Sequence, residues 1–279
     1  MKRVEPNLYT KEYYLNDASG YEIFGKTFGK VIDVRLKKIL DLIPLKVDQR
    51  ILDIGCGRGE LALWMSKLTG GKVLGIDYSE DAIKLAVDAK RRWPKSVQRR
   101  VAFKHLDIKK LKTIQKYDLV VMTEVLEHLY PDEQIVVFGK INNLLKKDGL
   151  LFIHTAPNKW FNIYIYKYWC YPVSLFISVV YKFVFNKEYP RLIHPKLFRT
   201  HYHKIMHINE PDYISLWNLF KQTNFKGKIH STNVTVNNTV LSWKDAVYNF
   251  MLYLSPLSKY FPFNVFWGND FYAILKKAC

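Results

Sequence analysis

The ten residues ILDIGCGRGE, at positions 51–60, constrain the fold of this chain more than any other stretch. They begin as an apolar strand, pass through three glycines at alternate positions, and lead into an amphipathic segment that predicts a helix. A glycine turn between a strand and a helix lets a ligand approach the main chain and the helix N-terminus closely. The stretch therefore predicts a parallel α/β sheet with a ligand site at this turn.

The first half of the chain alternates short apolar runs with amphipathic segments, which is the pattern of a parallel sheet with crossover helices. The strands are apolar throughout, as expected for a sheet covered on both faces. They are predicted at residues 50–54, 72–77, 101–107, 117–123 and 150–155, and later at 226–236 and 269–277. Helices are predicted at residues 29–45, 59–68, 131–147 and 207–225, and after Ser79, which is a typical cap residue.

Two excursions interrupt this alternation, at residues 158–207 and at about 242–267. We therefore expect an N-terminal cap and ligand-binding core over residues 1–157 and an inserted lid over 158–207. Residues 208–279 then form the C-terminal part of the same α/β domain and include the second excursion.

The chain of 279 residues carries a formal net charge of +18, which favours polyanionic partners such as acidic lipid headgroups or nucleic acid. Residues 90–116 contain eleven Lys or Arg against one acid, and residues 158–207 contain eight against one. The three cysteines lie far apart and suggest a reducing interior. Because the first residues lack a signal-peptide core, we expect a cytoplasmic protein, peripheral on the inner membrane face.

Acids follow the predicted strands at Asp77 and Asp107, while Glu60 stands where a dinucleotide site needs a small residue. The motifs ILDIGCGRGE, VLGIDYS, LDI and YDLVVMTEVLEHL resemble the class I S-adenosylmethionine-dependent methyltransferases over about residues 45–157. The resemblance implies a Rossmann-like, doubly wound, seven-stranded sheet whose last strand is antiparallel, and binding of S-adenosylmethionine. It places Gly55, Gly57 and Gly59 under the methionine part, Asp53 near its amino group, Asp77 at the ribose, Tyr78, Asp107 and Ile108 at the adenine, and Glu124 beside the methyl group.

An early stretch, YTKEYYLNDASGYEIFG, resembles the N-terminal cap of such enzymes. Tyr13 and Tyr14 in this stretch either line the active site or serve in aromatic packing. Both alternatives remain open from the residues alone.

The stretch TEVLEHL, residues 123–129, offers two carboxylates and an imidazole beside the expected methyl group. In a helix, Glu124, Glu127 and His128 would share one face, and such a set suits Mg²⁺ or Mn²⁺. The stretch resembles the ubiquinone-biosynthesis O-methyltransferases and the small-RNA 3′-terminal 2′-O-methyltransferases, which implies a metal held by Glu124, Glu127, His128 and His207, near Glu210. Alternatively His128 is a general base without metal, and the glutamates and His207 bond to the main chain.

Further histidines remain candidates for the same region. His154 ends a predicted strand and is expected to point into the pocket, whereas His194, His201 and His203 lie within the basic excursion. Glu127, His128 and His207 are the predicted catalytic residues.

The excursion at residues 161–185 is strongly apolar and aromatic. Its uncharged run, 168–181, is short for a bilayer span, and Pro172 is expected to interrupt a helix there. Flanking lysines and aromatic residues are typical of a membrane interface. We expect a lid that also touches an anionic membrane surface; a cap that packs on itself or on a second subunit, or a transmembrane hairpin, is the alternative.

These features together predict an S-adenosylmethionine-dependent O-methyltransferase that acts on a lipid-linked, glycan or other amphiphilic small-molecule acceptor. An RNA 2′-O-methyltransferase is the alternative suggested by the charge, although the sequence contains no recognisable RNA-binding module. A non-catalytic membrane scaffold that binds S-adenosylmethionine is the third possibility.

Overall fold

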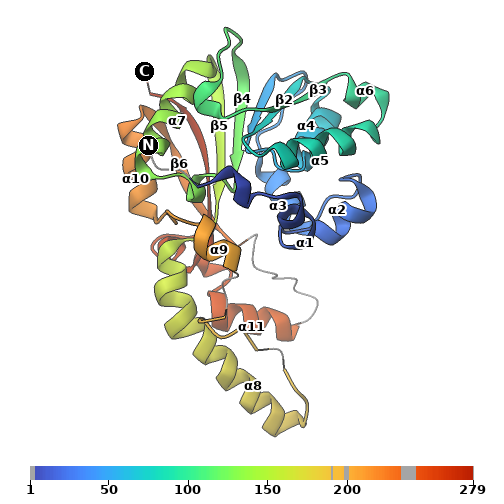
Figure 1. The fold of residues 1–279 in the computed structure, drawn as a ribbon. Coiled ribbons are helices and arrows are strands. Elements are labelled where there is room, and N and C mark those ends of the chain that lie inside the picture. Colours follow the sequence, from blue (N-terminus) through green and yellow to red (C-terminus); the bar gives the residue numbers. More distant parts are fainter. Residues whose placement is uncertain (1–3, 190, 198–200, 234–242, 279) are drawn as a thin grey trace.

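The computed structural model describes residues 4–189, 191–197, 201–233 and 243–278 of the chain. Within these residues seven strands form one sheet in the order β3-β2-β1-β4-β5-β7-β6 (Figure 1), in which β7 runs antiparallel to both of its neighbours. The predicted doubly wound sheet with an antiparallel last strand is thus confirmed. The strands are β1 Ile51–Ile54, β2 Val73–Asp77, β3 Val101–His105, β4 Tyr117–Thr123, β5 Leu145–Thr155, β6 Phe225–Thr232 and β7 Asp270–Lys277.

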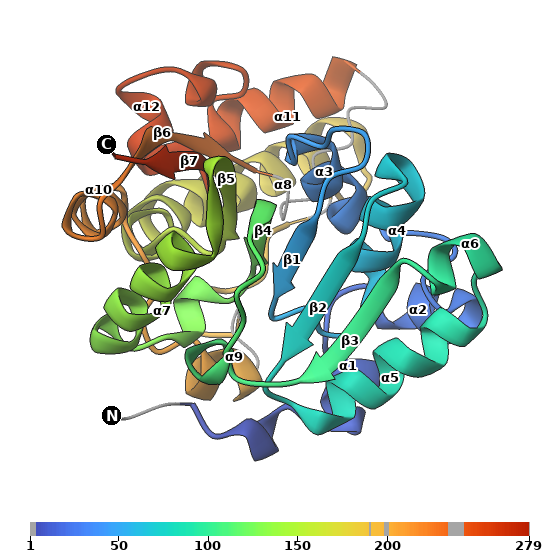
Figure 2. The same cartoon turned by 90° about the horizontal axis from the view of Figure 1, so that it is seen from above.

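Helices cover both faces of the sheet, because successive side chains of each buried strand point to opposite sides. Leu52 and Val120 belong to a core beneath α7 (Pro131–Leu144) and α10 (Tyr213–Gln222). Ile51 and Leu119 belong to the core on the other face (Figure 2). That face is covered by α3 (Val34–Leu42), α4 (Glu60–Thr69), α5 (Glu80–Arg91) and α6 (Lys95–Gln98).

Local capping explains where several helices begin. Ser79 caps α5 as predicted, since its hydroxyl accepts a hydrogen bond from the Ala82 amide at 3.1 Å. The helix predicted from residue 29 begins only at Val34, because the Asp33 carboxylate accepts from the Arg35 amide at 2.9 Å and so starts α3 there.

The predicted helix at 131–147 is three residues too long. Helix α7 ends at Leu144, and β5 begins at once with Leu145, which pairs with Tyr117 of β4. Both residues of this pair are almost fully buried. The tertiary pairing therefore overrides the helical pattern that the following lysines suggested.

The N-terminal residues pack across the carboxyl ends of the parallel strands (Figure 1). They form η1 (Pro6–Leu8), α1 (Lys11–Asn16) and α2 (Tyr21–Thr27). The buried Arg58 guanidinium ties this cap to the glycine turn, because it donates to the main-chain oxygens of Tyr14 and Ser19 at 2.8 and 2.7 Å. Its Nε also pairs with Glu60 at 2.9 Å.

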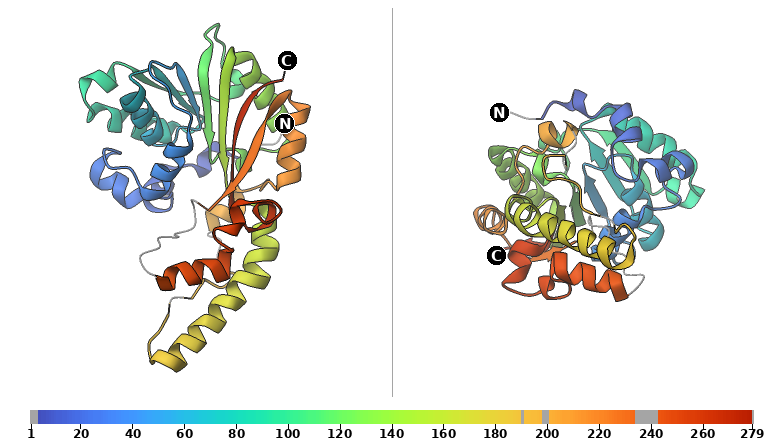
Figure 3. Two further views of the ribbon diagram at one scale, coloured as in Figure 1. Left: turned by 180° about the vertical axis from the view of Figure 1, so that it is seen from behind. Right: turned by 90° about the horizontal axis from the view of Figure 1, so that it is seen from below.

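The two excursions form an arm that projects from the same edge of the sheet (Figures 1 and 3). Its long helix consists of η4 (Phe161–Cys170), a π-helix, and α8 (Tyr171–Phe185). The second excursion contributes α11 (Trp243–Tyr253), η5 (Leu257–Lys259) and α12 (Phe263–Trp267), and α9 (His201–Met206) connects the arm to the core. Residues 234–236 of the predicted sixth strand lie outside the described residues.

Pro172 does not interrupt the long helix, contrary to the sequence-based expectation. The Tyr171 amide bonds to the Tyr166 carbonyl five residues back. This wider turn leaves space for the proline ring where an α-turn would bring a clash. The continuous helix Phe161–Phe185 is long and apolar enough to cross a membrane by length and composition, and it is the one such helix among the described residues.

Asn158 joins the arm to the sheet. Its buried side-chain amide donates to the carbonyls of Val265 and Gly268 at 3.0 and 2.9 Å, and its main-chain amide donates to Asn269 at 2.6 Å. These bonds hold the bases of both excursions together.

We expect Asn158→Ala to lower the free energy of unfolding by about 1–3 kcal/mol, because two carbonyls at this junction lose their donor. Denaturant unfolding measures the change. Asn143→Ala, on the exposed side of α7, is the matched control and should stay within about 0.5 kcal/mol of the unaltered protein. Equal stabilities for the two variants would contradict the role given to Asn158.

Candidate active site

A cavity of about 290 Å³ lies where the parallel strands end, between the glycine turn and the N-terminal cap. This is the usual place for a ligand in an open α/β sheet. The predicted site residues that line it are Gly55, Gly57, Asp77, Tyr78, Asp107, Ile108, Glu124, His128 and His207. Asp53, Gly59 and Glu127 stand behind the cavity wall instead.

The glycine turn depends on the absence of side chains. Gly55 has a φ of 70°, and a Cβ there would lie 2.3 Å from Cγ2 of Val125. The Gly57 amide donates to Asp77 Oδ2 at 3.0 Å, and the Ser79 amide donates to Oδ1 at 2.8 Å. Burial raises the pKa of Asp77 to about 6, although these two donors act in the opposite direction.

Asp53 lies beneath the turn and is 1% exposed. Neither carboxylate oxygen has a hydrogen-bond partner within the described parts of the chain. Burial raises the pKa of Asp53 to about 8, and the nearby Asp77 carboxylate adds to the rise. A buried acid of this kind suits a ligand that brings an ammonium group, so the turn fits the amino-acid end of S-adenosylmethionine.

The wall for the other end of such a ligand is apolar and aromatic. Ile108 and the Tyr78 ring line it, and the Tyr9 ring lies 5.3 Å from that of Tyr78. Asp107 is oriented by the Lys109 amide at 2.9 Å and begins η2 (Ile108–Lys110). These groups fit a flat heterocycle and its polar edge.

Glu124 does not share a helical face with Glu127 and His128, because its φ is 55° and only Leu126–His128 form a short helix, η3. Its carboxylate lies between two cationic or donor groups, Arg35 at 2.9 Å and His154 at 2.6 Å. Burial alone would raise the pKa of Glu124, but Arg35 and His154 outweigh it and hold that pKa well below its usual range.

Glu127 is fully buried behind η3. Its Oε2 accepts from the Thr155 hydroxyl at 2.8 Å, whereas Oε1 has no partner among the residues that the structure describes. Burial and the neighbouring Glu124 carboxylate raise the pKa of Glu127 well above its ordinary value. Two adjacent acids thus differ in protonation, as expected when like charges share a low-dielectric site.

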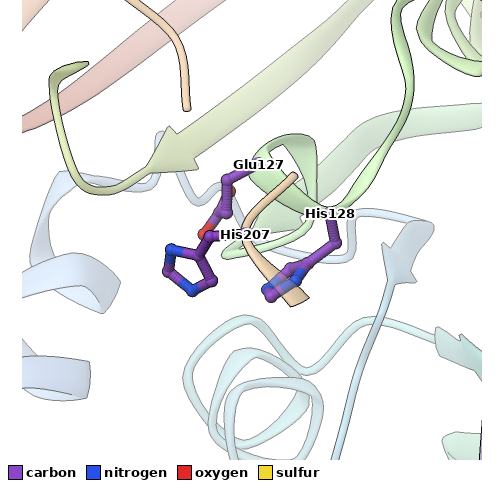
Figure 4. A group of neighbouring side chains, drawn as sticks. All are labelled: Glu127, His128 and His207. Atoms are coloured by element: carbon purple, nitrogen blue, oxygen red, sulfur yellow. The ribbon is translucent and has the colours of Figure 1, made fainter. Parts of the chain in front are cut away.

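Two imidazoles complete the group with Glu127 (Figure 4). His128 Nδ1 lies 3.0 Å from the Met206 carbonyl, and the rings of His128 and His207 have centroids 4.8 Å apart. One ligand atom from each of Glu127, His128 and His207 lies within 4.8 Å of the others. One carboxylate and two imidazoles are a ligand set that could hold a divalent cation, and Glu127 Oε1 is a buried oxygen without a partner among the described residues.

The remaining histidines are placed differently. His154 is buried and bonded to Glu124 and is absent from the described cavity lining, and His194 contacts Tyr171 on the arm, with ring centroids 5.1 Å apart. The side chains of His201 and His203 lie outside those that the structure describes. Sequence reasoning missed Arg35 and Thr155, since neither stands in a recognisable motif.

The cover of the cavity comes from the N-terminal cap. Tyr13 and Tyr14 both line the cavity and also pack on each other, with ring centroids 5.1 Å apart, so both roles considered from the sequence apply. Of the described residues in the two excursions, His207 alone lines it, so the expected lid is instead a projecting arm. Tyr202 of α9 reaches back to the cap, with its ring 5.2 Å from that of Tyr13.

Comparison with known proteins agrees with this architecture. The family model of a methyltransferase domain matches residues 28–229. The chain is 33% identical over 169 residues to a ubiquinone biosynthesis O-methyltransferase of Coxiella burnetii, which covers 58% of this chain and 64% of that protein. It is 28% identical over 146 residues to the cyclopropane-fatty-acyl-phospholipid synthase of Escherichia coli, covering 50% and 36%.

A solved structure of a glycopeptide N-methyltransferase complexed with S-adenosylmethionine is also similar, with a TM-score of 0.54 and 11% identity. It covers 87% of this chain and 92% of that one, and the likeness concerns the fold. The chain spans less than two thirds of the length of the curated relatives it matches.

Gly55→Ala should weaken binding of S-adenosylhomocysteine by about tenfold or more, because the new methyl group would displace Val125 and the turn. Isothermal titration calorimetry measures the affinity. Gly139→Ala, where a Cβ meets open space in α7, is the control; it should bind normally and gain about 0.5–1 kcal/mol in stability. Unchanged affinity in Gly55→Ala would show that the glycine turn does not contact the ligand.

Asp53 should make this binding pH-dependent. Its carboxyl is protonated below its pKa of about 8, so a ligand ammonium must displace the proton. We expect affinity to rise with pH between about 6 and 8, by up to about tenfold per pH unit. Asp53→Asn should bind more weakly and lose this slope, and an identical pH profile for both proteins would exclude Asp53 as the titrating group.

Proposed function

Because this chain belongs to the methyltransferase-domain family and is a class I S-adenosylmethionine-dependent methyltransferase, we propose that it methylates a hydroxyl oxygen of an amphiphilic acceptor. The acceptor would be lipid-linked, a glycan or another amphiphilic small molecule. The observation that carries this proposal is the group of Glu127, His128 and His207 beside the cofactor cavity.

A hydroxyl acceptor needs a group that removes its proton, whereas an amine needs little beyond positioning. The Met206 carbonyl can only accept a hydrogen bond, so His128 carries its proton on Nδ1 and presents Nε2 as the basic nitrogen of the neutral ring. The acceptor oxygen forms a bond to the methyl carbon as the carbon–sulfur bond breaks, with its electron pair passing to sulfur. Where no cation is bound, the hydroxyl proton then passes to His128 Nε2.

As the alternative to His128 acting as the base, we infer that Glu127, His128 and His207 hold Mg²⁺ or Mn²⁺, with His128 Nε2 as a ligand and the acceptor proton released to solvent. Such an ion would lower the pKa of the acceptor hydroxyl and orient it. Glu127 must lose its proton to act as a ligand, so its raised pKa makes cation binding tighter as the pH rises. Glu124, engaged by Arg35 and His154, would stay ionised beside this set and act through its charge.

The names of two relatives support an amphiphilic acceptor, since one refers to ubiquinone and the other to a fatty-acyl phospholipid. The basic stretch at residues 90–116 supports RNA as the second candidate. The two acceptors are distinguished by incubating the protein with labelled S-adenosylmethionine and either a cellular lipid extract or total RNA. Label in the organic phase is expected, whereas label in RNA alone would overturn the amphiphilic acceptor.

Glu127→Gln should keep the hydrogen bond from Thr155 but lose the anionic ligand. We expect loss of bound Mn²⁺ by elemental analysis and a fall in methyl transfer of about 10²- to 10⁴-fold. Binding of S-adenosylhomocysteine should change by less than about 0.5 kcal/mol.

His230→Ala, on the exposed edge of β6, is the control for these measurements and should behave as the unaltered protein. EDTA should stop turnover and Mn²⁺ restore it. Full turnover in EDTA would remove the cation and leave His128 as the base; full activity in His128→Ala as well would contradict the assignment of this group.

A further inference from the structure

The arm presents an apolar face that its own packing leaves uncovered. Here the arm means residues 161–197 and 243–267. Its inner side forms a small core in which η4 packs against α11, with Phe161, Ile165, Tyr166 and Cys170 against Leu252 and Tyr253. The opposite side of the long helix points away from this core (Figures 1 and 3).

Large apolar side chains follow that outer side at helical spacing. Phe176, Val180 and Phe183 are 64%, 42% and 90% exposed, and intervals of four and three residues keep them on one face. An apolar groove between α8 and α11 continues this surface, lined by Trp169, Pro172, Val173, Phe176, Phe250, Met251 and Leu254. An uncovered apolar surface of this extent marks an interaction site.

Basic residues outnumber acids around this face. The arm contains seven Lys or Arg residues and two acids, and Glu188, one of the acids, lies 3.9 Å from Lys182. At the far end of the arm, Lys244 Nζ lies over the rings of Phe185 and Trp243 at 5.2 and 6.0 Å. Aromatic rings and lysines beside an apolar helix face suit the headgroup region of an anionic bilayer.

The same structure argues against a transmembrane span. Helix α8 ends at Phe185 with Asn186 as its C-cap, and the described residues 187–189 and 191–197 return beside it without helical structure. Tyr166 donates its hydroxyl proton to the Ile193 carbonyl at 2.8 Å, and Ser178 donates to the Tyr189 carbonyl at 3.2 Å. A span would carry this irregular segment, with its charged Lys187, Arg191 and Lys196, into hydrocarbon, which lipid-exposed chains avoid.

We propose that the arm docks on the surface of an anionic bilayer, with the outer face of its long helix seated at the boundary between headgroups and acyl chains. Because the arm and the cavity occupy the same edge of the sheet, docking would bring the cavity towards the membrane surface (Figure 1). The further step, that docking presents a lipid-linked acceptor to this cavity, rests on the proposed function. The docking itself does not depend on it.

Cosedimentation with vesicles tests the docking. The full chain should bind vesicles of phosphatidylcholine mixed with phosphatidylglycerol, bind pure phosphatidylcholine far more weakly, and release as salt is raised. The double variant Phe176→Glu/Phe183→Glu should lose binding by about tenfold or more. Lys182→Glu/Lys187→Glu should lose roughly fivefold or more for each lysine. Val47→Glu/Ile114→Glu, at two exposed apolar positions outside the arm, is the matched control and should bind normally.

Two further measurements keep the outcomes distinct. All variants should bind S-adenosylhomocysteine normally, because the altered side chains are solvent-exposed and none of them lines the cofactor cavity. Loss of that binding in the unaltered protein would instead contradict the proposed function. Light scattering tests whether a second copy of the chain, and not a membrane, covers the apolar face of the arm. A stable dimer that Phe176→Glu/Phe183→Glu dissociates, together with no vesicle binding, would overturn docking. Equal vesicle binding by the arm variants and their control would overturn it as well.

Discussion

The ionised carboxylate of Glu124, held between Arg35 and His154, is the interaction on which the arrangement of the site depends. It joins three elements that are distant in sequence: a helix of the N-terminal half, the turn after β4, and the end of β5. Burial raises the pKa of the adjacent Glu127 well above its ordinary value, and the negative charge of Glu124 adds to the rise. One short stretch thus supplies two acids whose environments shift their pKa values in opposite directions.

Three separate parts of the chain therefore build the cavity. The glycine turn and the acids behind it form the floor for the cofactor, the aromatic cap closes one side, and the segment that ends the arm brings His207 to the other. Arg58 connects the first two, since it bonds to the cap and to Glu60 within the turn. From the first excursion only His207, among the described residues, reaches the cavity, and the apolar arm projects away from the same edge (Figure 3). Under the proposals above, the cofactor site belongs to the common fold and acceptor choice to the arm.

Some elements could be predicted from the sequence and others could not, for physical reasons. The central strands were predictable because each is an apolar run buried on both faces, as the neighbours Ile51 and Leu52 of β1 illustrate. The end of α7 was not, because the pairing of Leu145 with Tyr117 outweighs a local helical pattern. Pro172 was predicted to interrupt the helix because proline does so within a regular α-helix. Its effect depends on whether the preceding turn is an α-turn or a wider π-turn, and residue type does not specify that width.

What the sequence determined by itself is the doubly wound sheet and the cofactor turn, since both rest on local requirements: apolar strands, glycines without a Cβ, and acids such as Asp77 at strand ends. What only the tertiary structure decided is how the two acids and the imidazoles combine. The left-handed backbone at Glu124 directs its carboxylate to Arg35, 89 residues away, and leaves Glu127 to meet His128 and His207. Long-range partners of this kind depend on the packing of whole elements, and the spacing of residues along the chain does not encode them.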